Sequence, residues 1–344
     1  MQASPCYPLL CEPLFKPKIW GGRGLEKILD KRLPPGELIG ESWEVADVPE
    51  GTSGIANGPL TGMSLRQAME QYGEALVPAP QNPRFPLLVK FIDAQDDLSV
   101  QVHPGRDACE RHFPEERSKE ECWIVVRSAA GGCILHGVKP GTTRSEVAAR
   151  MRDGTVVECM RRVPVQAGDV VRLPPGTIHA LLKGVMVLEI QEPSDSTFRV
   201  YDYGRLGEDG RPRPLHIDRA LKALRLREDA PAKLASRRQI FAWGHHESLM
   251  DIAPYRIERL SLQRPVVCEA PSAVSIVFVV LAGRVLVRQG DDATALRLGD
   301  TCILPAAVDR AELHPKGDAQ IILATPGPGP KEVGAGPAVR IEGL

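Results

Sequence analysis

The chain has 344 residues, of which 43% are hydrophobic and 25% charged, and its 43 Lys and Arg nearly balance its 44 Asp and Glu. This charge balance, without a long basic run, gives no support for binding to nucleic acid or to an anionic membrane. The sequence lacks both an apolar stretch of about 20 residues and the pattern of a signal peptide, so we expect a cytoplasmic protein without membrane partners.

The eight cysteines show neither a CxxC pair nor a regular spacing. In a chain of this length such cysteines are typical of reduced, buried thiols. We therefore expect neither a disulfide framework nor a zinc–cysteine cluster.

Short apolar runs, separated by many of the 32 glycines and 31 prolines, dominate the pattern. Closely spaced short strands predict a mainly β protein built as a sandwich or barrel. In chain order we expect a helix over 64–76, strands over 87–92 and 122–126, a helix over 144–151 with a capping box, strands over 169–173 and 185–190, a helical connector over 217–226, and strands over 275–281 and 285–288.

An internal repeat favours two domains. Residues 168–179 read G-x5-P-x-G-x2-H, and residues 299–310 repeat this spacing with Ala307 in place of the glycine and Arg310 in place of the histidine. Each copy predicts a turn, an apolar strand and a second turn that aims the last residue inward. Because the second copy lacks the histidine, we place the function in the first domain.

The most informative segment is 98–103, in which Ser99, Gln101 and His103 alternate with Leu, Val and Val. Alternation with a period of two predicts a strand whose polar side chains share one face. Polar groups turned inward cost free energy unless they bind something, so this face indicates a metal or polar-ligand site.

Four residues are candidate metal ligands: Gln101, His103, Glu121 and His179. Two imidazoles and a carboxylate suit Zn, Fe, Ni, Co or Mn, and the amide oxygen of Gln101 could add a weak fourth ligand. Taken singly, each has an ordinary interpretation: a core or rim histidine, a surface glutamine, or a charge in a solvated loop. The combination supports a metal site.

A second polar group follows in 187–203, where Glu189 and Gln191 share a strand face and Arg199 lies downstream. A carboxylate, an arginine and a metal in one cleft can abstract a proton beside a carbonyl and stabilise the resulting oxyanion. The alternative is an ordinary salt bridge between Glu189 and Arg199.

These motifs resemble known families. The spacing G-x5-P-x-G-x2-H is similar to the second motif of the cupins. The chain resembles, over roughly 5–325, the type I phosphomannose isomerases, also called mannose-6-phosphate isomerases, in their short bacterial form. The runs that carry this resemblance are 18–22, 40–44, 86–104, 119–123, 176–180 and 188–199.

The resemblance implies two cupin-type barrels, each a double-stranded β-helix or jelly roll, with a few short helices. It places a catalytic, metal-binding domain at 1–228 and a second, metal-free domain at 229–326. The Gly- and Pro-rich residues 327–344 are expected to form a loosely held tail.

The resemblance also implies one Zn²⁺ per chain, or another divalent metal, held by the four candidate ligands. Glu121 is preferred to Glu120 because the family's ligand lies two residues after the lysine. Arg199 would lie beside C1 and C2 of the substrate, and the preferred base is Glu189, with Lys119 or a metal-bound water as competitors. The residues implied to line the substrate pocket are Trp20, Ser99, Lys119 and Glu189, with Arg205 near the phosphate.

The implied activity is the interconversion of mannose 6-phosphate and fructose 6-phosphate through an enediol(ate), in a monomer or homodimer. Two alternatives use the same scaffold. A cupin with two histidines and one glutamate could be a non-haem iron dioxygenase. A sugar-binding cupin without catalysis is the other.

Overall fold

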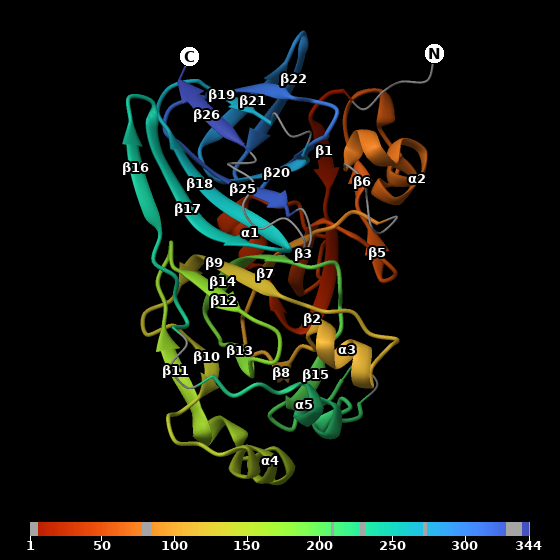
Figure 1. Ribbon diagram of the computed structural model, residues 1–344, viewed down its shortest axis with the longest axis vertical. Helices are drawn as coiled ribbons and strands as arrows, with labels where there is room; N and C mark the ends of the chain where they lie inside the picture. Colours follow the sequence, from red (N-terminus) through yellow and green to blue (C-terminus); the bar gives the residue numbers. More distant parts are fainter. Residues whose placement is uncertain are drawn as a thin grey trace.

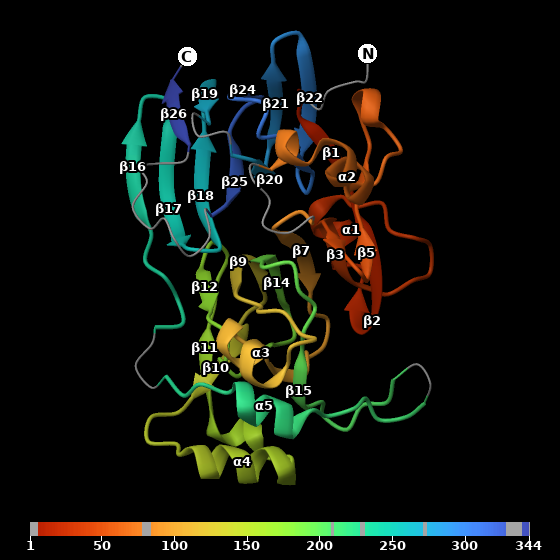
Figure 2. The ribbon, with the colours of Figure 1, turned by 45° about the vertical axis from the view of Figure 1, so that its right-hand side comes forward.

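A computed structural model of the chain describes residues 6–77, 84–207, 210–227, 231–270, 274–327 and 339–343. The fold is mainly β, as predicted, and consists of two barrels stacked along the long axis of the molecule (Figure 1; Figure 2). Each barrel is formed by two facing antiparallel sheets, so the predicted two-barrel architecture is confirmed.

The lower barrel in Figure 1 carries the candidate site. Its six-stranded sheet has the order β12 (Val170–Leu173), β9 (Glu121–Ser128), β14 (Val185–Gln191), β7 (Leu88–Asp93), β3 (Ile39–Val45) and β2 (Leu14–Gly22). Its five-stranded sheet has the order β11 (Met160–Pro164), β10 (Cys133–Val138), β13 (His179–Leu181), β8 (Val100–Val102) and β15 (Phe198–Tyr201).

The upper barrel also has two sheets. The eight-stranded sheet has the order β16 (Arg237–Phe241), β17 (Gly244–Ile252), β18 (Tyr255–Leu262), β25 (Ala319–Pro326), β20 (Ile276–Ala282), β23 (Thr301–Leu304), β1 (Leu9–Glu12) and β6 (Gly54–Ile55). The five-stranded sheet has the order β22 (Asp292–Arg297), β21 (Arg284–Gln289), β24 (Arg310–Pro315), β19 (Val266–Glu269) and β26 (Arg340–Gly343). A small ribbon pairs β4 (Asp47–Val48) with β5 (Gly51–Thr52).

Helices are few and short: α1 (Gly24–Leu29), α2 (Leu65–Leu76), α3 (Arg106–His112), α4 (Arg144–Asp153) and α5 (Ile217–Ala223), with 3₁₀ turns at Gly58–Leu60 and Val156–Cys159. The three predicted helices are α2, α4 and α5. Thr143 caps α4 by accepting from the Glu146 N–H, but the full capping box forms at Ser64, which begins α2. No described helix is long and apolar enough to cross a membrane.

Apolar side chains divide the lower barrel into an outer and an inner layer. Val100 and Val102 belong to a cluster with Ala220 of α5, which places them on the outer, helix-covered face of the five-stranded sheet. Trp123 and Leu181 belong to a second cluster between the two sheets. Because side chains alternate along a strand, the polar residues of β8 must point into the barrel.

The N-terminus crosses the expected domain boundary. Strand β1 pairs with β23, and the Ala306 N–H donates to the Leu76 carbonyl at the end of α2 (3.0 Å). A single core cluster also contains Val89 of β7 and Ile322 of β25. The first residues of the chain therefore pack with the C-terminal sheets, and the division at residue 228 stays a prediction.

Both copies of the predicted repeat form a strand, a turn and a second strand. In the first copy β12 leads to β13, which begins at His179, and in the second β23 leads to β24, which begins at Arg310. The expected tail is wrong for Arg340–Gly343, which form β26 because their backbone pairs with β19. Residues 328–338 and 344 of that prediction lie outside the described residues. All eight cysteines are free thiols, six of them buried, as expected.

Candidate metal centre and active site

Strand register brings the candidate residues onto one face. His179 of β13 pairs with Gln101 of β8, and Gln101 pairs in turn with Arg199 of β15. Directly opposed residues in antiparallel strands share a face, and His103 shares it with Gln101 by its spacing of two. Glu121 reaches the same space from the opposite sheet, where it begins β9.

Three of the four candidate ligands form a compact cluster. The ligand atoms of His103, Glu121 and His179 all lie within 4.8 Å of one another, and the three residues are buried. Gln101 is adjacent, with its Nε2 3.4 Å from His179 Nε2. The structure therefore brings together side chains that lie up to 78 positions apart in the sequence.

The protonation states of both histidines follow from their hydrogen bonds. His103 Nδ1 donates to the Ser196 carbonyl (2.8 Å), and His179 Nδ1 donates to the Thr177 carbonyl (2.9 Å), because a carbonyl oxygen can only accept. Burial lowers the pKa of both imidazoles, to about 3 for His179. Both rings are thus neutral at pH 7, with a lone pair on Nε2.

These lone pairs point at a carboxylate. The Nε2 atoms of His103 and His179 lie 3.3 and 3.5 Å from the Glu121 oxygens, and both oxygens are buried. Lys119 Nζ lies 2.5 Å from Oε1 and supplies a single positive charge. Two imidazole lone pairs and a carboxylate that converge on one point form a ligand set for a cation, and the Lys119 ammonium, which also lies 3.5 Å from His103 Nε2, balances only part of their negative charge. The residues therefore fit a divalent metal of the Zn, Fe or Mn type.

Glu189 lies beside this cluster on β14. It accepts from Trp123 Nε1 (2.7 Å) and pairs with Lys90 Nζ (3.5 Å). Burial raises the pKa of Glu189 to about 7, with the charge of Glu121 adding to the effect and Lys90 and Lys119 opposing it. A carboxylate with a pKa near neutrality can both accept and donate a proton.

Lys90, the buried partner of Glu189, was missed in the sequence analysis, as were the two other carboxylates near it. Besides Glu189, Lys90 Nζ lies 3.9 Å from Glu41 and 3.8 Å from Asp195. The available signal was a single charge inside an otherwise apolar strand, Leu-Val-Lys-Phe-Ile in β7, because buried lysines are rare unless paired.

Arg199 does not pair with Glu189, so the salt bridge considered as an alternative is absent among the described residues. Its Nη1 donates to the Pro214 carbonyl (3.1 Å), and its Nε is buried without a partner. Burial lowers the pKa of Arg199, and the nearby charge of Arg213 adds to the effect. The buried, unpartnered N–H group leaves Arg199 with a free hydrogen-bond donor among the described residues.

Of the other predicted pocket residues, Lys119, Ser99 and Trp20 are buried. Lys119 contacts Glu121 directly, and Ser99 is buried one residue before β8. Trp20 belongs to the apolar cluster inside the barrel. Arg205 pairs with Asp202 (2.6 Å) and donates to the Asp97 carbonyl (2.5 Å), so its charge is engaged by these two neighbours.

Comparison with known proteins identifies the family. Residues 9–136 match the model of the phosphomannose isomerase type I catalytic domain. The mannose-6-phosphate isomerase of Streptococcus mutans is 33% identical over 318 residues, which cover 92% of this chain and 98% of that protein. The chain belongs to the type I phosphomannose isomerase family.

Solved structures agree with this assignment. The mannose 6-phosphate isomerase of Bacillus subtilis matches with a TM-score of 0.85 and 29% identity, over 92% of this chain and 99% of that one. A zinc-bound mannose 6-phosphate isomerase shares the fold with a TM-score of 0.72 at 15% identity, over 93% of this chain and 99% of that one. The family predicted from the sequence motifs is confirmed.

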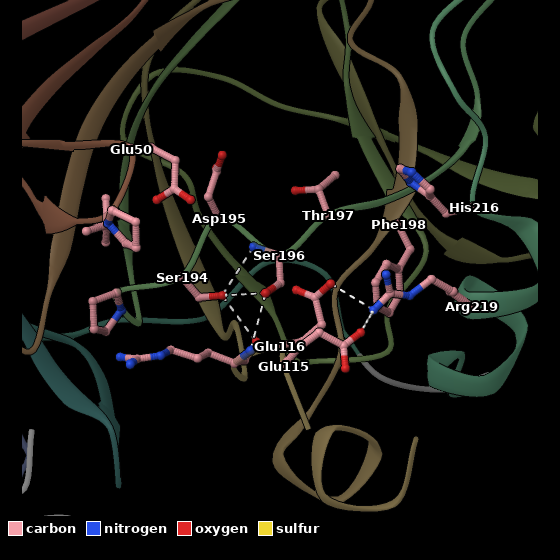
Figure 3. Close-up of a pocket in the computed structure, with 14 residues that line it drawn as sticks. Glu50, Glu115, Glu116, Ser194, Asp195, Ser196, Thr197, Phe198, His216 and Arg219 are labelled. Atoms are coloured by element: carbon pink, nitrogen blue, oxygen red, sulfur yellow. Dashed lines mark hydrogen bonds and ion pairs between the residues drawn. The ribbon is translucent and has the colours of Figure 1, made fainter. Parts of the chain in front are cut away.

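In this family member a cleft of about 340 Å³ borders the site (Figure 3). Figure 3 shows Glu115 and Glu116 directed at Arg219, with Asp195 and Ser196 on the neighbouring loop. The Ser196 carbonyl holds His103, and Asp195 faces Lys90. The loop that contains Asp195 and Ser196 thus separates the cleft from the metal cluster, and the same loop holds His103 in position.

Gly40 fixes the position of Trp20, because an added Cβ would lie 2.6 Å from the indole ring. We expect Gly40→Ala to lower the free energy of unfolding by about 1–3 kcal/mol through overpacking. Gly54→Ala is the control, since its backbone suits any residue and the added Cβ would come closest to the flexible end of the Glu12 side chain (3.0 Å). Urea unfolding of the two variants checks this, and equal stabilities would contradict the close packing of Trp20 on Gly40.

Proposed function

We propose that this chain is a metal-dependent aldose–ketose isomerase that interconverts mannose 6-phosphate and fructose 6-phosphate. The observation that carries the proposal is the pair of neutral imidazole lone pairs that meet the buried Glu121 carboxylate beside Glu189. The activity of the Streptococcus mutans relative, which the chain covers almost completely, supports the same reaction.

The metal would be held by His103, Glu121 and His179, with the Gln101 oxygen as a fourth ligand once the amide turns its Oε1 inward. Zinc suits this mixed nitrogen and oxygen set, and a zinc-bound family structure shares the fold. When bound, such a cation polarises carbonyl and hydroxyl oxygens of the substrate.

Glu189 would take the proton from C2 of the open-chain aldose and return it at C1, since its pKa of about 7 suits both steps. Lys119, which is also buried beside Glu121, is the alternative proton carrier. Arg199 would donate its unpartnered Nε–H to the enediolate oxygen, where charge develops in the transition state.

The remaining assignments extend the same proposal. The substrate would be the small sugar phosphate itself, in a cytoplasmic protein that acts as a monomer or homodimer. Trp20 and Ser99 would line the sugar pocket, and Arg205 would lie near the phosphate. Oxygen consumption with iron(II), without sugar-phosphate exchange, would instead favour a dioxygenase, and sugar binding without turnover would favour a non-catalytic cupin.

Removal of the metal gives the direct test. We expect a chelator to abolish isomerase activity in a coupled assay and zinc to restore it, because a substrate oxygen would then lose its cationic partner. Activity that is indifferent to the chelator, in protein shown to be metal-free, would contradict the proposal.

The pH dependence tests Glu189. If Glu189 is the base, kcat/KM falls as the pH drops through about 7, because the carboxylate becomes protonated. A cation bound at Glu121 cancels the repulsion between the two carboxylates, so this acid limb of the pH profile then lies at a lower pH. Lys90 stabilises the ionised form, so Lys90→Met should move the limb up by about 1–3 pH units. Lys183→Met, on the exposed surface, is the control. A limb unchanged in Lys90→Met would remove Glu189 as the titrating group.

A further inference from the structure

A second cavity, of about 140 Å³, lies where the two sheets of the lower barrel meet at their edges. Strand β12 forms one wall, β10 and β11 form the other, and residues 225–227, Pro231 and Leu234 line the remaining side. In Figure 1 these strands lie on the left of the lower barrel, away from α3. The four candidate metal ligands are not among the residues that line it.

Four arginines line this cavity, Arg161, Arg172, Arg225 and Arg227, and none of the described lining residues is acidic. Outside the cavity, Glu120 pairs with Arg172 (2.6 Å) and Asp107 pairs with Arg225. Positive charge therefore enters the cavity from three strands or segments that are far apart in the sequence.

Arg227 is held by two uncharged partners. Its Nη1 donates to the Pro175 carbonyl (3.1 Å) and to the Thr177 hydroxyl (3.4 Å), and no described carboxylate lies within 4.0 Å of its guanidinium. Burial lowers the pKa of Arg227, the charges of Arg172 and Arg225 lower it further, and the charge of Glu120 opposes them. Like charges held together in a partly closed space favour a bound anion.

His136 adds a neutral polar wall. Its Nε2 donates to the Arg172 carbonyl (2.9 Å), which leaves Nδ1 to accept from Arg161 (3.4 Å). The imidazole thus holds the Arg161 guanidinium against the cavity. Planar guanidinium groups match the oxygen geometry of phosphate, which they bind through paired hydrogen bonds.

The size of the cavity limits the ligand. Organic ligands usually occupy about 300–1,000 Å³, whereas one water takes about 30 Å³. A space of about 140 Å³ accommodates a tetrahedral anion but not a sugar. We propose that this cavity binds a phosphate dianion, either inorganic phosphate or the phosphate end of a metabolite whose remainder stays in solvent.

The cavity abuts the metal centre without sharing its ligands. Thr177 faces both: its hydroxyl accepts from Arg227, and its carbonyl accepts from His179 Nδ1. Glu120, which holds Arg172, directly precedes Glu121. This proposed phosphate site is therefore distinct from the substrate pocket. It borders the metal centre through Thr177, which holds His179, and through Glu120, which precedes Glu121.

Calorimetric titration of the full chain with inorganic phosphate, at constant ionic strength, tests the site. We expect Arg227→Gln to raise the dissociation constant of one phosphate site by at least about tenfold, because a charge-assisted hydrogen bond between guanidinium and phosphate is lost. Arg161→Gln gives a second variant from the opposite wall. Arg237→Gln, on the exposed strand β16, is the matched control and should bind phosphate as the wild type does.

The melting temperature and an isomerase assay without added phosphate check that each variant is folded. Loss of phosphate binding at the cavity can therefore be distinguished from failure of the proposed isomerase function. Glycerol 3-phosphate distinguishes the sources: tighter binding than inorganic phosphate assigns the site to a phosphate ester, and weaker binding assigns it to the free ion. Identical isotherms for wild type, Arg227→Gln and Arg161→Gln would overturn the proposal, as would an equal loss in Arg237→Gln.

Discussion

Replacing His103 with alanine is expected to reduce metal affinity and isomerase activity together, by at least about 100-fold. His103 supplies one of the two neutral nitrogens that face Glu121, and without it the cation keeps a weaker, more open set of ligands. Metal content after dialysis and kcat/KM in the coupled assay are the two measurements. Adding excess zinc should recover part of the activity.

The matched control is His112→Ala, which removes an exposed imidazole at the end of α3. It should keep full metal content and activity. A His103→Ala protein that holds metal as tightly as the control would show that the ion, if present, is bound elsewhere.

Glu189→Gln is expected to lower kcat by about 10²–10⁴-fold while leaving the metal in place. The amide keeps the size of the side chain and can still accept from Trp123 Nε1, but it cannot carry the proton between C2 and C1. Because Glu189 is not among the three clustered ligands, metal content should be unchanged.

Exchange of the C2 proton with solvent separates this role from a structural one. We expect the exchange rate to fall with kcat in Glu189→Gln and to stay normal in Glu37→Gln, which alters an exposed carboxylate. Wild-type exchange in Glu189→Gln would transfer the base role to Lys119.

The local pattern of residues was sufficient to predict the polar face of the site. Alternation in 98–103 correctly placed Gln101 and His103 on one side of β8, because the strand period is a geometric constant. The choice of Glu121 over Glu120 came from the family resemblance. The structure shows its physical basis, since Glu120 turns outward to Arg172 while Glu121 faces the histidines.

Features that depend on distant partners could not be predicted. The pairing of β1 with β23 joins residues about 290 positions apart, and no local pattern encodes such a partner. Helices α1 and α3 have six and seven residues, too few for a helical period to appear. Lys90 gives one local signal, a charge in an apolar strand, but its partners Glu189 and Asp195 appear beside it only in the folded structure.

The most direct test of the account is X-ray absorption at the zinc edge, with metal analysis, on the purified wild-type protein. We predict about one zinc per chain with a mixed shell of two imidazole nitrogens and carboxylate or amide oxygens, lost in His103→Ala. A wild-type protein that is active without metal, or whose zinc lacks imidazole ligands, would contradict the central claim.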